Sequence, residues 1–360
     1  MFTTLDELRR FTVARNFSTL TTLKRALHRM EFVQADPIRA PARAQDLILR
    51  HRVNGYRAGD LERRYPTLDI AEDFFINYGF VTTGLQVLMH PRGDSSLTQK
   101  KKARLVLEFV RERGLVHPRE VDAHFSHGKV TNYWGGSSNA TTRLLEDMHY
   151  RGMLRVARRE KGIRIYSPYD HDVRTTTASE RRARMDALVD VVVGIYAPLP
   201  AASLSYYLRR LRYAAPQWRN DVQSAFERAK QRLASARVAG VDWYWPAGER
   251  PVRLTSKPAP DVLRLLAPFD PVVHDRTRFE LLWGWAYRFE AYTPAAKRKL
   301  GYYALPMLWR DRVIGWANLA IESGELKFNF GFVSGGPPNE RAFTSELEAE
   351  LDRVRFFLGL

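Results

Sequence analysis

The chain has 360 residues, of which 57 are lysine or arginine and 40 are aspartate or glutamate, so its formal net charge is +17. This excess of positive charge favours a polyanionic partner, nucleic acid first and an anionic membrane surface second. The chain contains no cysteine, which excludes disulfides, a cysteine nucleophile and zinc bound by cysteine.

Membrane insertion and export are not expected. No apolar run is long enough to span a bilayer, and the opening residues MFTTLDELRRFTVARNF lack the apolar core of a signal peptide. We therefore expect a cytoplasmic protein, associated with the nucleoid when it is bound to DNA. The sequence has no clear coiled-coil seam, and we expect a monomer.

The first segment, residues 1–90, is predicted to be a winged-helix-like unit. The apolar residues at helical spacing in its first helix are Leu20, Leu23, Leu27 and Met30. A second helix is predicted from the spacing of Ala44, Leu47 and Ile48. A short third helix, residues 60–65, is stopped by Pro66.

The second segment, residues 98–172, predicts three helices and a hairpin. KKARLVLEFVRERG ends at Gly114, HPREVDAHF has Pro118 in its first turn, and SNATTRLLEDMHYRG is capped by Ser138 or Asn139. Two alternating strands follow in MLRVARREKGIRIYSP. This order is typical of a winged helix, in which the third helix and the hairpin, or wing, contact DNA.

The predicted wing is strongly basic. Its cations are Arg155, Arg158, Arg159, Lys161 and Arg164. Cations at these places suit the phosphates of double-stranded DNA, which we expect as the partner. The alternative is that they only form a solvated face, which is a common role for a basic run.

The third segment, residues 179–250, predicts three helices, the last in DVQSAFERAKQRLASARVAG, followed by a strand in GVDWYWPAG. Residues 251–360 predict a β-rich domain with turns at Val313-Ile314-Gly315 and Ser323-Gly324-Glu325 and a closing amphipathic helix. The expected fold is α+β, with three tandem winged-helix units around a DNA channel, a C-terminal antiparallel β element and a closing helix.

The stretch Gln34-Ala35-Asp36-Pro37 places an amide and a carboxylate two residues apart. Pro37 disfavours helical geometry at Asp36, and in an extended backbone residues two apart project to the same side. A carboxylate and an amide together can hold and activate one water molecule. The alternative is that Asp36 is the N-cap of a helix that begins between Pro37 and Pro41.

Other chemistry is poorly represented in the sequence. It contains no Gly-x-x-x-x-Gly-Lys-Ser/Thr loop for phosphate and no Gly-x-Ser-x-Gly nucleophile elbow. The histidines lack the spacing of a known zinc site. We expect neither a metal nor a cofactor.

Two stretches near opposite ends of the chain resemble the winged-helix DNA glycosylases of the YcaQ and AlkZ type. The first is FVQADPIRAPARAQDLILRHRV, and the second runs from Leu265 to Trp309 and includes EAYTPAAKRKLGYY. Residues 69–93 depart from the aromatic and histidine-containing stretch of that family. The resemblance implies a Gln-x-Asp catalytic motif, with Gln34 and Asp36 as the catalytic residues.

The resemblance also implies a reaction. An alkyl group at N7 makes guanine a cationic leaving group that needs no protonation, and hydrolysis passes through an oxocarbenium-like sugar. Asp36 would stabilise this cation and activate water, and Gln34 would position the water. The implied enzyme is a monofunctional glycosylase for N7-alkylguanine, including interstrand crosslinks. The alternative is a non-catalytic winged-helix DNA-binding protein, such as a transcription regulator.

Further DNA contacts are expected from residues that combine cations with aromatic rings. Those in the two stretches of resemblance are Arg39, Arg43, Tyr292, Lys297, Arg298, Lys299, Tyr302 and Tyr303. Cations suit phosphates and aromatic rings suit exposed bases. The alternative is that the tyrosines belong to a sheet core and that the cations only solubilise the surface.

Overall fold

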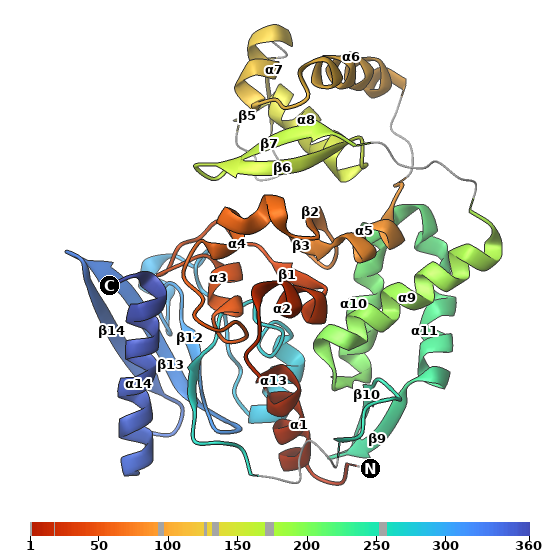
Figure 1. Cartoon of the computed structure of the whole chain (residues 1–360). Helices are drawn as coiled ribbons and strands as arrows, with labels where there is room; N and C mark the ends of the chain where they lie inside the picture. The colour runs from red at the N-terminus through yellow and green to blue at the C-terminus, as the bar shows by residue number, and fades with distance from the viewer. Residues whose placement is uncertain are drawn as a thin grey trace. The chain divides into compact units, whose positions relative to one another are not determined.

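A computed structural model describes residues 2–17, 19–92, 97–125, 128–131, 137–169, 176–251 and 258–360 (Figure 1). The chain divides into two units. The first unit comprises residues 1–61, 189–209 and 226–360, and the second comprises residues 62–188 and 210–225. Among the described residues, no helix is long and apolar enough to cross a membrane.

The N-terminal part of the chain is helical around one short strand. Its elements are α1 (Leu5–Phe17), α2 (Leu23–Met30), β1 (Phe32–Gln34), α3 (Ala44–Leu49) and α4 (Asp60–Arg64). Helix α2 begins behind Thr22, whose hydroxyl accepts a hydrogen bond from the Arg25 N–H. Leu23, Leu27 and Met30 are buried as predicted, whereas Leu20 is exposed because it precedes the helix.

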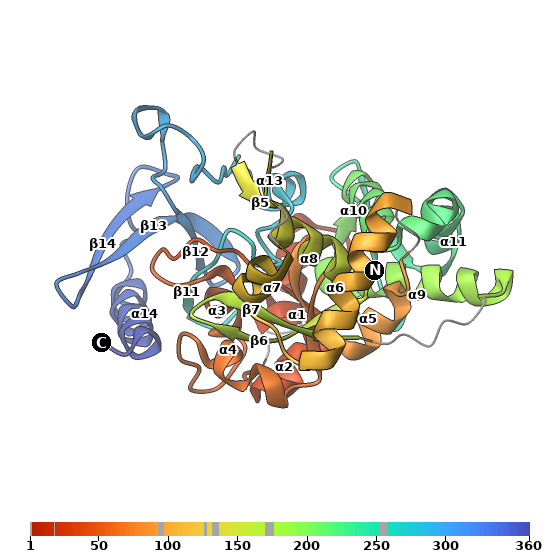
Figure 2. The ribbon, with the colours of Figure 1, turned by 90° about the horizontal axis from the view of Figure 1, so that it is seen from above.

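A four-stranded antiparallel sheet with a helix alongside it forms the C-terminal part of the first unit (Figures 1 and 2). Its elements are β11 (Leu263–Leu265), β12 (Leu305–Trp309), β13 (Arg312–Glu322), β14 (Glu325–Phe332) and α14 (Arg341–Leu358). The buried Glu350 of α14 accepts the Leu265 N–H at 3.0 Å and pairs with Arg50. The predicted β element and closing helix are confirmed. Between β11 and β12 lie α13 (Arg276–Trp283) and η3 (Ala295–Lys297).

Gly315 lies inside β13 and does not form the turn predicted at residues 313–315. A Cβ on Gly315 would lie 2.1 Å from the Gly331 carbonyl oxygen, and a Cβ on Gly331 would lie 2.2 Å from the Trp316 ring. Both glycines are therefore required by close approach of β13 to β14. The second predicted turn, at Ser323-Gly324, is confirmed.

The second unit contains three helices followed by a hairpin, in the order predicted. The helices are α6 (Leu97–Arg113), α7 (Pro118–Phe125) and α8 (Ala140–Tyr150), and the hairpin is β6 (Leu154–Glu160) with β7 (Ile163–Pro168). Lys161 and Gly162 form its turn, both with positive φ. The helices pack on the hairpin around a core of Val106, Val110, Leu145 and Tyr166 (Figure 1). A small additional sheet joins β4 (Lys129–Thr131) to β5 (Ser137–Asn139).

Residues 70–82 form a second hairpin in this unit, which the sequence did not lead us to expect. Its elements, with the turn before it and the helix after it, are η1 (Tyr65–Thr67), β2 (Ile70–Phe74), β3 (Tyr78–Thr82) and α5 (Thr83–Met89). The buried Asp73 of β2 accepts hydrogen bonds from His90 and Arg92, each at 2.7 Å. This pairing fixes the end of the segment on its own hairpin.

The region between the predicted second and fourth segments is helical and ends in a small sheet. Its elements are α9 (Ala178–Tyr196), β8 (Leu199–Pro200), α10 (Ala201–Ala214), η2 (Pro216–Asp221), α11 (Val222–Arg232), β9 (Ala234–Val238) and β10 (Val241–Trp245). The predicted third helix is too long, because residues 234–238 pair with β10 as a strand. Gly240, with φ of +77°, makes the turn between them. The predicted boundary at residue 172 and residues 252–257 of the β-rich domain lie outside the described residues.

Candidate functional site

The Gln34–Asp36 segment joins β1 to α3 in the first unit. Gln34 is the last residue of β1 and is buried, and Asp36 is half-buried in the loop that follows. The Asp36 Oδ1 accepts a hydrogen bond of 2.9 Å from the Ile38 N–H. The alternative that Asp36 caps a helix is wrong, because α3 begins only at Ala44 and Asp36 closes a local turn.

The environment of Asp36 raises the pKa of its carboxyl group. Burial raises the pKa of Asp36, and the hydrogen bond from Ile38 offsets only part of this effect. Burial is the main cause that raises the pKa of Tyr292 and of Tyr303. The negative charge of Asp36 is the second cause for both phenols. These two tyrosines of the C-terminal stretch therefore lie within electrostatic range of the motif carboxylate.

Tyr303 differs from Tyr292 and Tyr302 because it is 2% exposed. Its ring packs edge-on against Phe289 at 5.3 Å between ring centroids. Its buried hydroxyl oxygen has no hydrogen-bond partner among the residues that the structure describes. Burial and the nearby Asp36 charge hold the pKa of Tyr303 well above its usual range, so the phenol keeps its proton. A buried ring does not fit the base-stacking role predicted for Tyr303.

The segment from Tyr292 to Tyr302 is a loop whose ends are tied together. The Glu290 carboxylate accepts the backbone N–H groups of Lys299 and Leu300, each at 2.8 Å. We call this pair of bonds the Glu290 clamp. Inside the loop, Arg298 donates to the Thr293 carbonyl oxygen at 2.8 Å, and its guanidinium lies 5.0 Å from the Tyr302 ring centre. The clamp therefore fixes the loop without using the side chains at its tip.

Exposure separates the predicted DNA-contact residues of this loop. Tyr292 is 78% exposed and Tyr302 is also exposed, together with Lys297 and Lys299. Arg298 is half-buried by its contacts within the loop. The surface thus presents two rings and two ammonium groups, which is the combination that suits bases and phosphates.

A groove of about 780 Å³ joins the two stretches that carry the resemblance. Arg39 and Pro41 of the motif loop line it together with Gly301, Tyr302 and Tyr303. The remaining lining comes from β13 and β14, where Lys327 and Phe328 are exposed. Sequence reasoning missed this pair, because the alternation of KFNF predicts a buried phenylalanine. The signal available in the sequence was the aromatic Phe328 directly after Lys327.

Arg39 and Arg43 occupy different surroundings. Arg39 is exposed at the groove, whereas Arg43 is the half-buried N-cap residue of α3, and its charge opposes the rise that burial causes in the pKa of Asp46. Asp46 also accepts hydrogen bonds from the Tyr56 hydroxyl and the Gly59 N–H. The Arg43 charge thus acts on the buried Asp46, and Arg39 is the better placed of the two for an external ligand.

The five wing cations of the second unit have unequal roles. Arg155 and Lys161 are exposed, and Arg155 donates to the Ser167 hydroxyl at 3.0 Å. Arg158 is exposed and paired with Glu160. Arg159 and Arg164 instead turn back onto the hairpin at residues 70–82, where they meet Glu72.

Glu72 is 1% exposed and lies at the centre of this contact. Arg159 binds both of its carboxylate oxygens at 2.6 Å, and the Tyr78 hydroxyl donates to it at 2.7 Å. Burial alone would raise the pKa of Glu72, but the hydrogen bonds and charge of Arg159, with Arg164, hold it below its usual range. Arg159 is therefore a structural residue as well as a predicted DNA contact.

The fold has a known counterpart. The solved structure of the DNA glycosylase AlkZ of Streptomyces sahachiroi matches it with a TM-score of 0.67 over 100% of this chain and 98% of that chain. The sequence identity is 14%, so this likeness shows a shared fold of mixed helix and sheet.

The family model named DNA glycosylase AlkZ-like matches residues 27–357, and the chain belongs to that family. The matched range contains both stretches that carry the resemblance. Membership in this family identifies the chain as a DNA glycosylase, and its partner is DNA.

Proposed function

We propose that this chain is a monofunctional DNA glycosylase that hydrolyses the N-glycosidic bond of N7-alkylguanine, including guanine in interstrand crosslinks, and leaves an abasic site. The observation that carries the proposal is the half-buried Asp36, which lies within electrostatic range of Tyr292 and Tyr303 and belongs to the loop whose residues Arg39 and Pro41 line the groove. A carboxylate that is partly removed from water interacts more strongly with a cation formed beside it.

The proposed roles follow from the charge that develops during the reaction. N7-alkylguanine leaves as a neutral base, so the enzyme needs no acid to protonate it. The Asp36 carboxylate stabilises the oxocarbenium-like sugar and accepts a proton from the attacking water. Gln34 orients that water through its amide. No lysine nucleophile is needed, which supports hydrolysis without strand cleavage. We assign Asp36 and Gln34 to the Gln-x-Asp subtype of the family on the same grounds.

The shape of the groove supports action on crosslinked bases. Most glycosylases extrude the target base into a closed pocket, which a base tethered to both strands cannot enter. The groove here is bordered by the exposed Tyr302 and Phe328, which suit stacking on a base that stays near the duplex. We further propose that the chain acts as a monomer on double-stranded DNA and that the predicted winged-helix segments bind the duplex.

The test of the proposal is incubation with duplex DNA that carries one N7-methylguanine, followed by alkaline cleavage of abasic sites. A nitrogen-mustard crosslink serves as the second substrate. Omission of the alkali distinguishes a monofunctional enzyme, which leaves the strand intact, from a lyase. If the wild-type protein binds both duplexes and releases neither base, the chain is a DNA-binding protein and the proposal fails.

Lys297→Ala is expected to weaken binding to duplex DNA without changing the rate of the bound complex. The Lys297 ammonium is exposed on a loop held by the Glu290 clamp, so its loss leaves the fold intact. One phosphate contact fewer should reduce the slope of log affinity against log salt by about 1. Fluorescence anisotropy at several salt concentrations measures the slope, and an unchanged slope contradicts the predicted contact.

Tyr303→Phe is expected to lower the rate of base release and to keep or raise thermal stability. The buried hydroxyl has no partner among the described residues, so its removal eliminates a desolvation cost of about 1–3 kcal/mol. We propose that the same hydroxyl, which is within electrostatic range of Asp36, donates to the bound water or to the sugar. A single-turnover assay and a thermal melt are the measurements. Loss of stability with full activity would assign Tyr303 to the core alone.

A further inference from the structure

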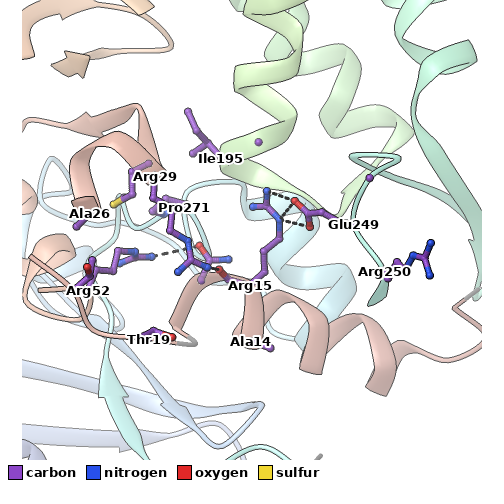
Figure 3. A pocket seen from close by; sticks show the side chains of 15 residues that line it. Ala14, Arg15, Thr19, Ala26, Arg29, Arg52, Ile195, Glu249, Arg250 and Pro271 are labelled. Carbon is purple, nitrogen blue, oxygen red and sulfur yellow. Dashed lines mark hydrogen bonds and ion pairs between the residues drawn. The ribbon is translucent and has the colours of Figure 1, made fainter. Parts of the chain in front are cut away.

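A pocket of about 550 Å³ in the first unit is lined by four arginines and shares no residue with the groove at Tyr303 (Figure 3). The arginines are Arg15 of α1, Arg29 of α2, Arg52 after α3 and Arg250 after β10. Figure 3 shows Arg15, Arg29 and Arg52 gathered on one side of Glu249 and Arg250 on the other. Arginines from four segments therefore line one cavity, and those from three of the segments gather on one side of it.

The carboxylates at this pocket do not balance its positive charge. Glu249 accepts two hydrogen bonds of 2.9 Å from Arg15. Asp270, which is buried, accepts bonds of 2.7 and 3.0 Å from Arg52. Among the described residues, four arginines thus line the pocket with the carboxylate of Glu249, and Asp270 pairs with Arg52 without lining the pocket. The pocket carries a net positive charge.

Arg29 and Arg250 line the pocket with exposed side chains. The Arg29 guanidinium donates to the Arg15 carbonyl oxygen at 2.7 Å, which ties it to α1. Partial burial lowers the pKa of Arg29, and the positive charges of Arg15 and Arg52 lower it further. An anion in the pocket would relieve this repulsion.

We infer that this pocket binds a phosphate group. A phosphate can accept hydrogen bonds from several guanidinium groups at once. A carboxylate of the protein is held by its backbone and cannot reach all of them. The cavity is large enough for a phosphate together with part of a nucleoside. Two sources share this chemistry, a phosphate of the DNA backbone and a free phosphomonoester. The inference does not depend on the glycosidic chemistry proposed for Asp36.

The test is thermal unfolding of the full chain in inorganic phosphate, with sodium chloride at equal ionic strength as the reference. Phosphate should raise the melting temperature of the wild type. It should bind Arg29→Gln about tenfold more weakly, because one charge-assisted hydrogen bond is lost. The matched control is Arg25→Gln, an exposed arginine of the same helix that does not line the pocket. This control should respond as the wild type does.

A second variant should change phosphate affinity in the opposite direction. Glu249→Gln removes the negative charge that competes for Arg15, so phosphate should bind it more tightly than it binds the wild type. Tighter binding in Glu249→Gln and weaker binding in Arg29→Gln cannot both arise from a general loss of stability.

The salt dependence of DNA binding distinguishes the two sources. If a backbone phosphate occupies the pocket, Arg29→Gln lowers the slope of log affinity against log salt by about 1 and Arg25→Gln does not. If the ligand is a free phosphomonoester, the slope is equal in all variants and only the phosphate response of Arg29→Gln falls. Equal phosphate responses and equal slopes in wild type, Arg25→Gln and Arg29→Gln would overturn the inference.

Discussion

Asp36→Asn is expected to reduce the rate of N7-methylguanine release by at least about a hundredfold, as loss of a preorganised charge at a reacting centre does in other enzymes. Asparagine carries no charge to stabilise the sugar cation and cannot accept the proton of the attacking water. Affinity for duplex DNA should be nearly unchanged, because the phosphate contacts come from cations elsewhere. Single-turnover kinetics and anisotropy titration measure the two quantities separately.

The same variant should leave the loop in place. An asparagine oxygen can still accept the Ile38 N–H, which donates to Asp36 in the turn. Burial raises the pKa of Asp36, so ionisation of this group costs folding free energy at neutral pH, and Asn avoids that cost. The melting temperature should therefore stay equal or rise. Full activity in Asp36→Asn would disprove the mechanism.

The pH dependence provides an independent check of Asp36. Its carboxylate must be ionised to act, and its pKa is raised above the ordinary value of 3.8. The rate of base release should therefore fall on the acid side with a midpoint above that value. The residual activity of Asp36→Asn should lack this acid limb. If the rate falls at the same acid pH in the wild type and in Asp36→Asn, another group is responsible for the fall.

The second large effect is expected from Arg159→Ala, which should destabilise the second unit by about 3–5 kcal/mol. The substitution leaves Glu72 buried, ionised and without its bidentate partner. Because the pKa of Glu72 is held below its usual range, the pair contributes stability above the pKa of an unfolded glutamate. That contribution is lost as the pH falls through the folded pKa. Urea denaturation at neutral and acid pH should show the difference shrinking in acid.

Arg158→Ala is the matched control, one residue away on the same strand. Arg158 pairs with Glu160 at the surface, so its loss should cost less than about 1 kcal/mol. Adding Glu72→Gln to Arg159→Ala should recover part of the stability by removing a buried charge that has lost its bidentate partner. Equal stability of Arg158→Ala and Arg159→Ala would show that the Glu72 contact contributes nothing to folding.

Local patterns in the sequence predicted most helices and strands, because their signals are local. Helical spacing, a glycine at the end of a helix and alternation in strands predicted α6 to α8, β6 to β7 and the C-terminal sheet with α14. The hairpin of β2 and β3 was not predicted, and two other failures came where a contact with a neighbouring strand decided the structure. Residues 234–238 extend a helical pattern, yet they form β9 because β10 pairs with them. Gly315 suggested a turn, although its role is to admit the Gly331 carbonyl oxygen.

The site was predicted by residue type and only partly by environment. The Gln34–Asp36 motif was identified from Pro37 and from the family resemblance, and the loop conformation agrees with the exclusion of a helix at Asp36. No sequence rule shows that Tyr302 is exposed while its neighbour Tyr303 is buried near Asp36. Arg159 and Glu72 are 87 residues apart in the chain. Their pairing therefore depends on how two hairpins pack, which spacing along the chain does not specify.

The Glu290 clamp has a consequence for how enzymes of this kind diversify. The clamp bonds to backbone N–H groups, which every residue except proline supplies at positions 299 and 300. The identity of the tip residues, from Tyr292 to Lys297, is therefore decoupled from the conformation of the loop. Evolution can exchange these side chains to suit another adduct without first compensating for a loss of fold. We expect the tip to vary more freely among related chains than Glu290, and a library randomised at residues 292 and 297 should yield mostly folded proteins.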